Sequence, residues 1–259
     1  MALNILHEKE QIHNYLLCAP EYNAYLIGDL DDFFWPKTIW FAEIIENEIK
    51  AIAMLYVGME IPCLLAFCDN DIAPTSNLLN NIRQLLPKQF TAHLSTGLID
   101  VFGGKNIIEH YGHNCKMALR KSPHEVKSDK IRRLNLDDLE MIQKMYSIAY
   151  PDNWFDKRML ETGQYLGYFD NKYLVEITGI HVYSEEYKVA ALGNIATHPN
   201  YRGQQISFKL TSQLCYELRK KVNHIGLNVK SDNEAALKCY KKLGFEFIGN
   251  YDECMIKNT

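Results

Sequence analysis

The chain has 259 residues, of which 47% are hydrophobic and 23% charged, and its formal net charge is -4. This composition is typical of a globular protein long enough for two compact domains, and it excludes collagen-like, coiled-coil and disordered chains. Residues 126–259 carry 19 Lys and Arg against 17 Asp and Glu. We therefore expect neither a basic stripe nor a nucleic-acid partner.

The seven cysteines are scattered, never form a Cys-x-x-Cys pair, and lie mostly within apolar runs. This pattern favours reduced, buried thiols in a cytoplasmic protein over a disulfide or zinc framework. The N-terminus has no basic segment followed by an apolar one, and no apolar run is long enough to span a membrane. Neither secretion nor a membrane partner is expected.

The first half begins with a predicted helix at residues 8–18. Asp29, Asp31 and Asp32 lack the ligand spacing and closing Glu of a calcium loop, so we interpret them as a helix end and turn and expect no metal. Apolar runs separated by turn residues within 38–67 indicate a three-stranded antiparallel meander. After it we expect a helix from Pro74 to Pro87, a strand at 90–94, a short helix at 98–109 and a strand at 113–119.

Residues 121–129, KSPHEVKSD, are polar and without periodicity, which is typical of an interdomain linker. The second half repeats the order of the first: helices, an antiparallel meander, a helix, a strand, a helix and a strand. The predicted strands are 131–134, 165–169, 173–183, 189–197, 224–229 and 245–256, and the predicted helices 135–146, 155–162, 204–221 and 233–243. We expect an internal duplication, with domains at 1–122 and 129–259.

Residues 193–218 are the most informative stretch. They predict a buried strand, a tight turn containing Arg202 and Gly203, and then a helix whose N-terminus faces the end of the strand. Such a turn presents unpaired backbone N–H groups and the positive end of a helix dipole to one point, which suits a phosphate. The first half has no equivalent turn before its Pro74 helix.

Three segments in order, THPNYRGQQIS, IGLNVK and DNEAALKCYKKLGF, resemble the GNAT superfamily of acyl-coenzyme A dependent N-acyltransferases over residues 129–259. The runs GIHVYS and ALGNIATHPNYRG look most like its glycine N-acyltransferase-like branch, which often pairs a degenerate N-terminal half with a working C-terminal one. The resemblance implies an α/β (α+β) fold of tandem GNAT-like domains. Each would hold a mixed, mostly antiparallel sheet flanked by helices.

The resemblance also implies how acetyl-coenzyme A is bound as co-substrate. The strand at 193–197 would be bulged and would part from the next strand, and the pantetheine arm would pair with backbone at Ile195, Ala196 and Thr197. The diphosphate would lie on the turn, and a residue of the following helix would contact the coenzyme. The positions implied for these two contacts are Arg202, Gly203, Gln204, Gln205, Ile206 and Ser207 in the turn, and Asn233 in the helix.

This turn departs from the family pattern, which has glycine where this chain has Gln205 and glycine or alanine where it has Ser207. Glycine lets the backbone approach a phosphate without a side chain between them. Gln205 therefore either points outward and leaves its N–H available, or weakens coenzyme binding. The Ser207 hydroxyl could itself bond phosphate.

Tyr240 matches the family tyrosine that faces the thioester sulfur, where a phenol protonated at pH 7 can supply a proton to the departing thiolate. A packed aromatic residue is the alternative. For the base that deprotonates the amine, the nearby side chains are Glu176 and His181, and strand alternation places them on opposite faces. We favour His181, because a neutral imidazole accepts a proton near pH 7. A purely structural histidine and a base acting through water stay open.

The sequence therefore predicts direct transfer of an acetyl group from acetyl-coenzyme A to a primary amine of a small molecule or peptide. One alternative is a non-catalytic module that binds or senses acyl-coenzyme A, and another is an enzyme that uses longer acyl groups. The acidic first half would suit a cationic acceptor. A homodimer is left open.

Overall fold

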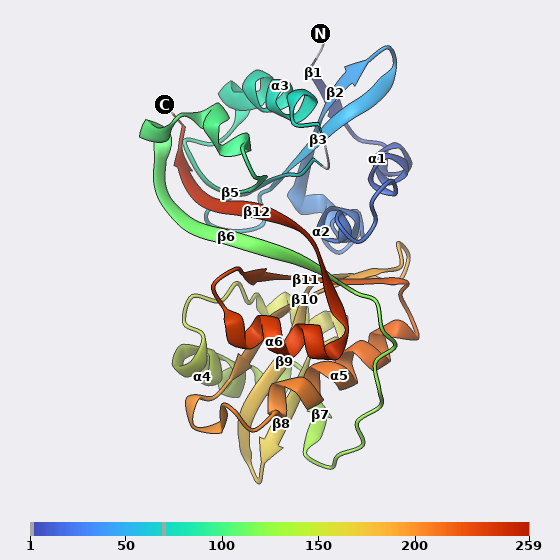
Figure 1. Cartoon of the computed structure of the whole chain (residues 1–259), viewed down its shortest axis with the longest axis vertical. Helices are drawn as coiled ribbons and strands as arrows, with labels where there is room; N and C mark the ends of the chain where they lie inside the picture. Colours follow the sequence, from blue (N-terminus) through green and yellow to red (C-terminus); the bar gives the residue numbers. More distant parts are fainter. Residues whose placement is uncertain (1–2, 69–70, 259) are drawn as a thin grey trace. The chain divides into compact units, whose positions relative to one another are not determined.

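The computed structural model describes residues 3–68 and 71–258 and divides into two compact units (Figure 1). The first unit holds Met1–Lys116, Lys230–Asp232 and Ile248–Thr259. The second holds Met117–Val229 and Asn233–Phe247. Each unit is built on strands of a mixed, mostly antiparallel sheet flanked by helices, so the predicted fold class is confirmed.

Strands of the first unit follow the spatial order β1-β2-β3-β4-β5-β12-β6. The predicted meander is confirmed as β2, β3 and β4, which pair antiparallel, whereas β4 and β5 pair in parallel. The strands are β1 (Leu3–Leu6), β2 (Thr38–Ile45), β3 (Glu48–Tyr56), β4 (Cys63–Ala66), β5 (Gln89–Ser95), β6 (Ile107–Leu119) and β12 (Phe245–Lys257).

The helices of the first unit are α1 (Lys9–Leu16), α2 (Ala24–Gly28) and α3 (Ala73–Ile82). Pro74 lies in the first turn of α3, where its missing N–H costs nothing, and the helix packs its leucines against β2 and β3. The prediction of a short helix at 98–109 is wrong. Two 3₁₀ segments stand there instead, Leu98–Phe102 and Gly104–Asn106, because Gly103 between them takes φ 74° and breaks the helix.

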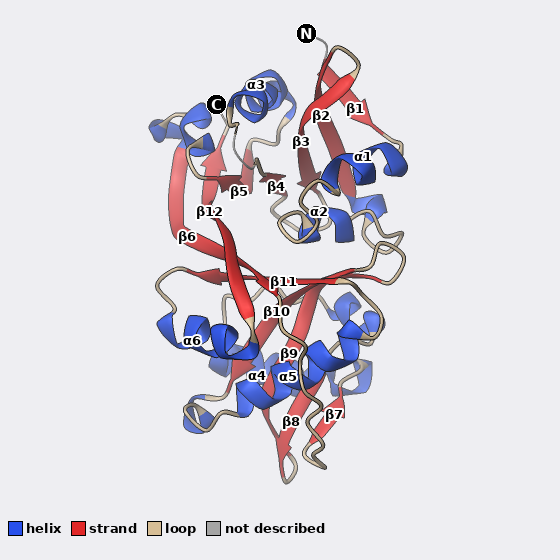
Figure 2. Cartoon of the chain, turned by 45° about the vertical axis from the view of Figure 1, so that its right-hand side comes forward, coloured by secondary structure: helices blue, strands red, loops and turns tan. Residues whose placement is uncertain are grey.

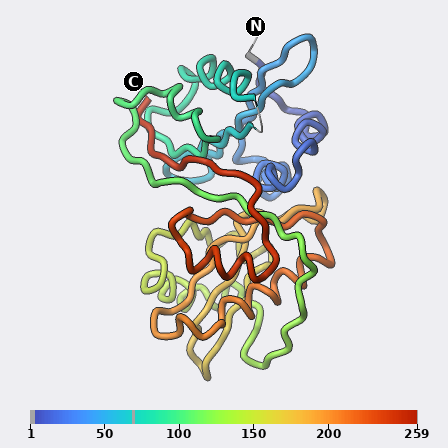
Figure 3. The backbone as a smooth tube through the Cα atoms, in the orientation of Figure 1, coloured from blue at the N-terminus to red at the C-terminus, as the bar shows by residue number. Residues whose placement is uncertain are grey.

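The last strand of the chain belongs largely to the first unit. Figure 3 traces β12 in red beside the green β6, and β12 pairs antiparallel with β5 from Tyr251 to Lys257. Its Cys254 and Ile256 are buried in the same core as Phe90 and Leu94. The two compact units therefore differ from the predicted division into 1–122 and 129–259. The end of β12 joins the first unit because its apolar side chains are buried in the core of that unit.

In the second unit, β10 pairs in parallel with β11, and the remaining pairs in the order β11-β10-β9-β8-β7 are antiparallel. Helices α4 and α5 pack on β9 and β10, and α5 also packs against α6 (Figure 2). The elements are β7 (Ile131–Arg133), α4 (Leu139–Ala149), β8 (Leu166–Asp170), β9 (Tyr173–Ser184), β10 (Val189–Thr197), α5 (Ile206–Arg219), β11 (His224–Lys230) and α6 (Glu234–Leu243), with 3₁₀ segments η5 (Leu136–Asp138), η6 (Lys157–Thr162) and η7 (Pro199–Tyr201).

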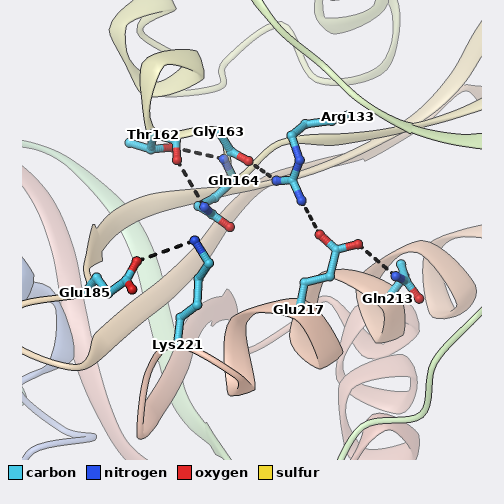
Figure 4. Close-up of polar contacts among 8 residues, drawn as sticks. All are labelled: Arg133, Thr162, Gly163, Gln164, Glu185, Gln213, Glu217 and Lys221. Atoms are coloured by element: carbon cyan, nitrogen blue, oxygen red, sulfur yellow. Dashed lines mark hydrogen bonds and ion pairs between the residues drawn. The ribbon is translucent and has the colours of Figure 1, made fainter.

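The polar stretch 121–129 forms no helix or strand and is tied to α5. The N–H of Val126 donates to Gln213 Oε1 at 2.7 Å, and the Ser212 hydroxyl donates to the carbonyl of His124 at 3.0 Å. Figure 4 shows a second attachment, in which Arg133 lies between Gly163 and Glu217 and bonds to both. The edge strand β7 and the segment before it are thereby held against α5.

No helix in the described parts of the chain combines the length and apolarity that crossing a membrane requires.

Candidate active site

Strand β10 carries a bulge in its second half. The pairing with β9 shifts register between Gly193 and Ala196, and Asn194 takes a left-handed φ of 54°. The carbonyl of Asn194 accepts the Tyr146 hydroxyl at 2.7 Å, and its side-chain amide donates to the Tyr165 hydroxyl at 2.9 Å. The bulge that the resemblance implied is present, and two buried tyrosines hold it.

Beyond this point β10 and β11 part. Their parallel register runs from Val189 opposite His224 to Leu192 opposite Leu227 and then stops, although both strands continue. Residues 193–197 thus have β9 on one side and no paired strand on the other. Backbone groups of a strand left without a neighbour can hydrogen-bond an extended ligand, as an added strand would. Ile195, Ala196 and Thr197 all lie in this stretch, which continues beyond the register with β11.

The turn after β10 leaves backbone N–H groups available at the start of α5. Among the described hydrogen bonds, none uses the N–H of Gly203, Gln204 or Gln205. Gly203 takes φ 78°, and the three residues are exposed. A helix N-terminus with free amides attracts anions, so the turn fits the diphosphate that the sequence predicted there.

The conformation of Gln205 shows where its side chain points. Its backbone has φ 59° and ψ 21°, the left-handed conformation that glycine adopts without strain. Its side-chain oxygen accepts from Lys242 Nζ on α6 at 3.2 Å. The side chain is directed to α6, and the helix-start amides stay uncovered, so glutamine replaces glycine here at the cost of backbone strain.

Glu176 is the most unusual side chain of the site. It lies on β9 opposite Thr197 and is fully buried, with the Thr197 and Ser207 hydroxyls near its carboxylate. Burial raises its pKa to about 7, against the opposing effects of the nearby Thr197 and Ser207 hydroxyls and the Arg202 charge. A carboxylate with this pKa can accept a proton at neutral pH.

His181 is placed differently. Its ring lies against Gly193, where an added Cβ would stand only 2.0 Å from His181 Cδ2. The pairing of β9 with β10 skips His181, since Ala191 faces Val182 and Leu192 faces Ile180. The register shifts by one residue at His181, and the placement of His181 and Glu176 on opposite faces stays a prediction.

Two residues complete the predicted set, Asn233 at the N-cap of α6 and Tyr240 within that helix. Asn233 caps the helix by accepting the N–H of Ala236 at 3.1 Å, and the residue is exposed. Tyr240 is buried, 8% exposed, with its ring edge-on to Phe245. Burial, followed by the charge of Glu176, raises the pKa of Cys239 to about 11, so Cys239 is a protonated thiol and a poor nucleophile.

Sequence reasoning missed the aromatic support of the bulge. Tyr146, Phe155 and Tyr165 pack in series, the first pair tilted and the second edge to face, with ring centroids 5.2 Å and 5.7 Å apart. The two tyrosines bond Asn194. Asn194 is 2% exposed, and its side-chain oxygen has no partner among the described residues. The pair Gly193-Asn194 inside a strand pattern was the available signal, since both residues favour a bulge.

Two hollows are lined by residues other than those of this site. One of about 280 Å³ in the second unit is lined by Arg132, Gln213 and Glu217, and one of about 400 Å³ in the first unit is lined by Tyr22, Cys68 and Ser95. Neither includes the parted strands or the α5 turn, and the site is recognised by its backbone geometry.

The part of the chain that holds this site matches a known protein family. Residues 129–245 match the acetyltransferase (GNAT) family model. That match covers the parted strands, the α5 turn and α6, and it supports the GNAT superfamily resemblance. The family implies acyl transfer from an acyl-coenzyme A to an amine. None of the curated proteins matches the chain.

Solved structures share the fold over the whole chain. A Drosophila protein superposes with a TM-score of 0.75 at 11% identity, covering 99% of each chain. A tandem GNAT protein from the clavulanic acid biosynthesis pathway gives 0.60 at 13% identity, covering 100% of this chain and 99% of the other. A GNAT acetyltransferase from Colwellia psychrerythraea gives 0.58 at 13%, covering 99% and 100%. These likenesses establish a GNAT-like fold.

Proposed function

We propose that the second unit transfers an acetyl group from acetyl-coenzyme A directly to a primary amine of a small molecule or peptide. The observation that carries the proposal is that β10 and β11 part after Leu192, directly before a helix start with free amides. An extended arm and a diphosphate would have adjacent places to bind.

The chain's residues would hold the donor in three places. Backbone at Ile195, Ala196 and Thr197 would pair with the arm, and the amides from Gly203 to Ser207 would bind the diphosphate. The exposed Asn233 would add a contact from the N-cap of α6. When bound, the coenzyme supplies a thioester, an acyl group activated by a good leaving group.

We assign the general base to Glu176 rather than to His181. Glu176 is buried beside Thr197 at the parted end of β10 and has a pKa of about 7. It would take the proton from the attacking amine as the C–N bond forms. Tyr240 would supply a proton to the sulfur as the C–S bond breaks. The proton taken up by Glu176 would then pass through solvent to the tyrosinate, which restores both groups.

The first unit would be a degenerate copy without coenzyme, as in the glycine N-acyltransferase-like branch. Its parallel pair β4 and β5 stays in register to Ala66 and Leu94, where β4 ends. Just beyond, the Ser95 hydroxyl accepts the N–H of Cys68 at 3.0 Å and bonds the Tyr22 hydroxyl at 2.9 Å. These bonds join the segments just after β4 and at the end of β5. The corresponding strands of the second unit, β10 and β11, part at the equivalent point.

The acceptor amine would enter on the side of the Tyr146, Phe155 and Tyr165 cluster, which flanks the bulge. The seven cysteines all lie in the described part of the chain and none forms a disulfide, which suits a cytoplasmic enzyme.

Isothermal titration of the full chain with acetyl-coenzyme A, followed by a thiol-release assay over a panel of amines, tests the proposal. We expect one coenzyme bound per chain and amine-dependent thiol release. Binding without release for any amine would favour the non-catalytic module, and tighter binding of larger thioesters would favour a longer acyl group. A stoichiometry of two would show that the first unit also binds coenzyme.

A further inference from the structure

Two histidines and an aspartate converge in the first unit, apart from the proposed acyl-transfer residues. His110 and His113 lie on β6, and Asp252 lies on the neighbouring β12. Asp252 Oδ1 is 3.2 Å from His110 Nε2 and 2.6 Å from His113 Nδ1. Both imidazole rings thus lie close to the same carboxylate oxygen, Asp252 Oδ1. The rings stand edge to face with centroids 5.5 Å apart.

The backbone at Gly112 explains how both rings reach the same oxygen. Residues three apart in a regular strand point to opposite faces, so alternation alone would separate His110 from His113. Gly112 takes φ 105° between them, a conformation that L side chains rarely adopt. No atom lies within 4 Å of the position that a Cβ would occupy there, so glycine serves the backbone conformation rather than close packing.

Burial separates the roles of the three side chains. The Asp252 side chain is 4% exposed, whereas those of His110 and His113 are 40% and 60% exposed. The carboxylate is therefore fixed within the protein, and the two rings are open to solvent. The next carboxylate, Glu253, is engaged elsewhere, because it accepts from Asn114 at 3.1 Å.

This donor set matches a divalent transition metal ion. Two imidazole nitrogens and a carboxylate oxygen are common ligands of zinc, at bond lengths of about 2.0–2.2 Å. Ligand atoms in such a tetrahedral site are about 3.3 Å apart. The three atoms here all lie within 4.8 Å of one another, and the His110 separation of 3.2 Å already fits. The exposed side leaves room for water as the fourth ligand.

We propose that His110, His113 and Asp252 bind one divalent transition metal ion, zinc or its cobalt(II) substitute, and that the ion joins β6 to β12. The sequence did not predict this site, since 139 positions separate Asp252 from His113. The proposal is independent of the acyl-transfer reaction. A ligand that binds only the folded chain stabilises it, so the ion should raise the melting temperature.

Cobalt(II) titration of the chelator-treated full chain, read by visible absorption, tests the site. We expect one ion per chain, with a nitrogen- and oxygen-ligated spectrum and no thiolate charge-transfer band. Zinc titration calorimetry on His110→Ala and His113→Ala should show at least tenfold weaker binding. The exposed His7 of the same unit provides a control, and His7→Ala should bind as the wild-type chain does.

Gly112→Ala tests the geometry without removing a ligand, and it should also weaken zinc binding and reduce the zinc-dependent rise in melting temperature. Circular dichroism of the metal-free variants would establish that each is folded. No saturable binding by the wild-type chain would overturn the proposal. So would unchanged affinity in the double variant His110→Ala/His113→Ala, or a thiolate band, which would place the ion on cysteine.

Discussion

Tyr146 donates its hydroxyl to the backbone carbonyl of Asn194 at 2.7 Å, and so fixes the bulge at which β10 departs from regular pairing. The bond joins α4 to the strand beside which the coenzyme arm is proposed to lie. Support of the parted strand therefore depends on a side chain more than forty positions earlier in the chain.

Tyr146→Phe should reduce the free energy of unfolding by about 1–2 kcal/mol, because it leaves a buried carbonyl without a partner. The loosened bulge should also lower kcat/KM. Urea unfolding and steady-state kinetics measure the two effects, with Tyr216→Phe, a half-buried tyrosine on α5, as control. An unchanged stability would show that the bulge holds itself.

Glu176→Gln should remove most of the turnover while acetyl-coenzyme A binding is retained. In the wild-type chain the rate should rise with pH through about 7, as Glu176 loses its proton and becomes a base. The control is Glu186→Gln, an exposed carboxylate. A pH profile that Glu176→Gln leaves unchanged would return the role to His181 or to water.

The same carboxyl should make stability depend on pH. Its pKa is raised from 4.5 to about 7 in the folded chain, so between these values the folded state holds a proton that the unfolded state has lost. The free energy of unfolding should therefore fall by about 3 kcal/mol as pH rises through this window. Denaturant titrations from pH 4 to 8 should show a flatter profile in Glu176→Gln.

Gln205→Gly should stabilise the chain by about 1 kcal/mol, because it relieves a left-handed backbone at a residue with a Cβ. Coenzyme affinity should stay the same or increase, since the amides keep their positions. Thermal unfolding and calorimetry measure both. The neighbouring Gln204→Gly serves as control, because no positive φ occurs at that position. A loss of stability in Gln205→Gly would show that the bond to Lys242 outweighs the strain.

Tyr240→Phe should cause a large loss of turnover with nearly unchanged coenzyme binding, because only the hydroxyl is removed and the ring keeps its contact with Phe245. Turnover at saturating donor and calorimetry separate the two quantities. An unchanged rate would make Tyr240 a packed aromatic residue, as the alternative interpretation holds.

Lys116→Met should alter the alkaline side of the stability profile. Lys116 is 2% exposed, its ammonium lies 3.3 Å above the Phe67 ring, and burial places its pKa well below 10.5. The folded state thus binds fewer protons than the unfolded state between its lowered pKa and 10.5, and stability should rise with pH there. Lys116→Met should abolish this rise in stability. The control Lys88→Met, at an exposed lysine, should preserve it.

The sequence by itself was enough for most of the elements and for the position of the phosphate-binding turn. Hydrophobic periodicity is local, so the meander at 38–67, the strand 189–197 and the helix after Arg202 follow from it. The Pro74 helix start and the Gly244 helix end are likewise local choices of backbone conformation. A resemblance carried by three motifs placed the coenzyme contacts on the same elements.

Only the tertiary structure decided the features that depend on distant contacts. Burial of the Glu176 carboxyl, the tyrosine support of Asn194, and the convergence of His110 and His113 on Asp252 each join residues from different elements. The register shift at His181 and the return of β12 to the first unit are also set by pairing partners. A pKa or a ligand set arises from the neighbours that packing supplies, which local sequence does not specify.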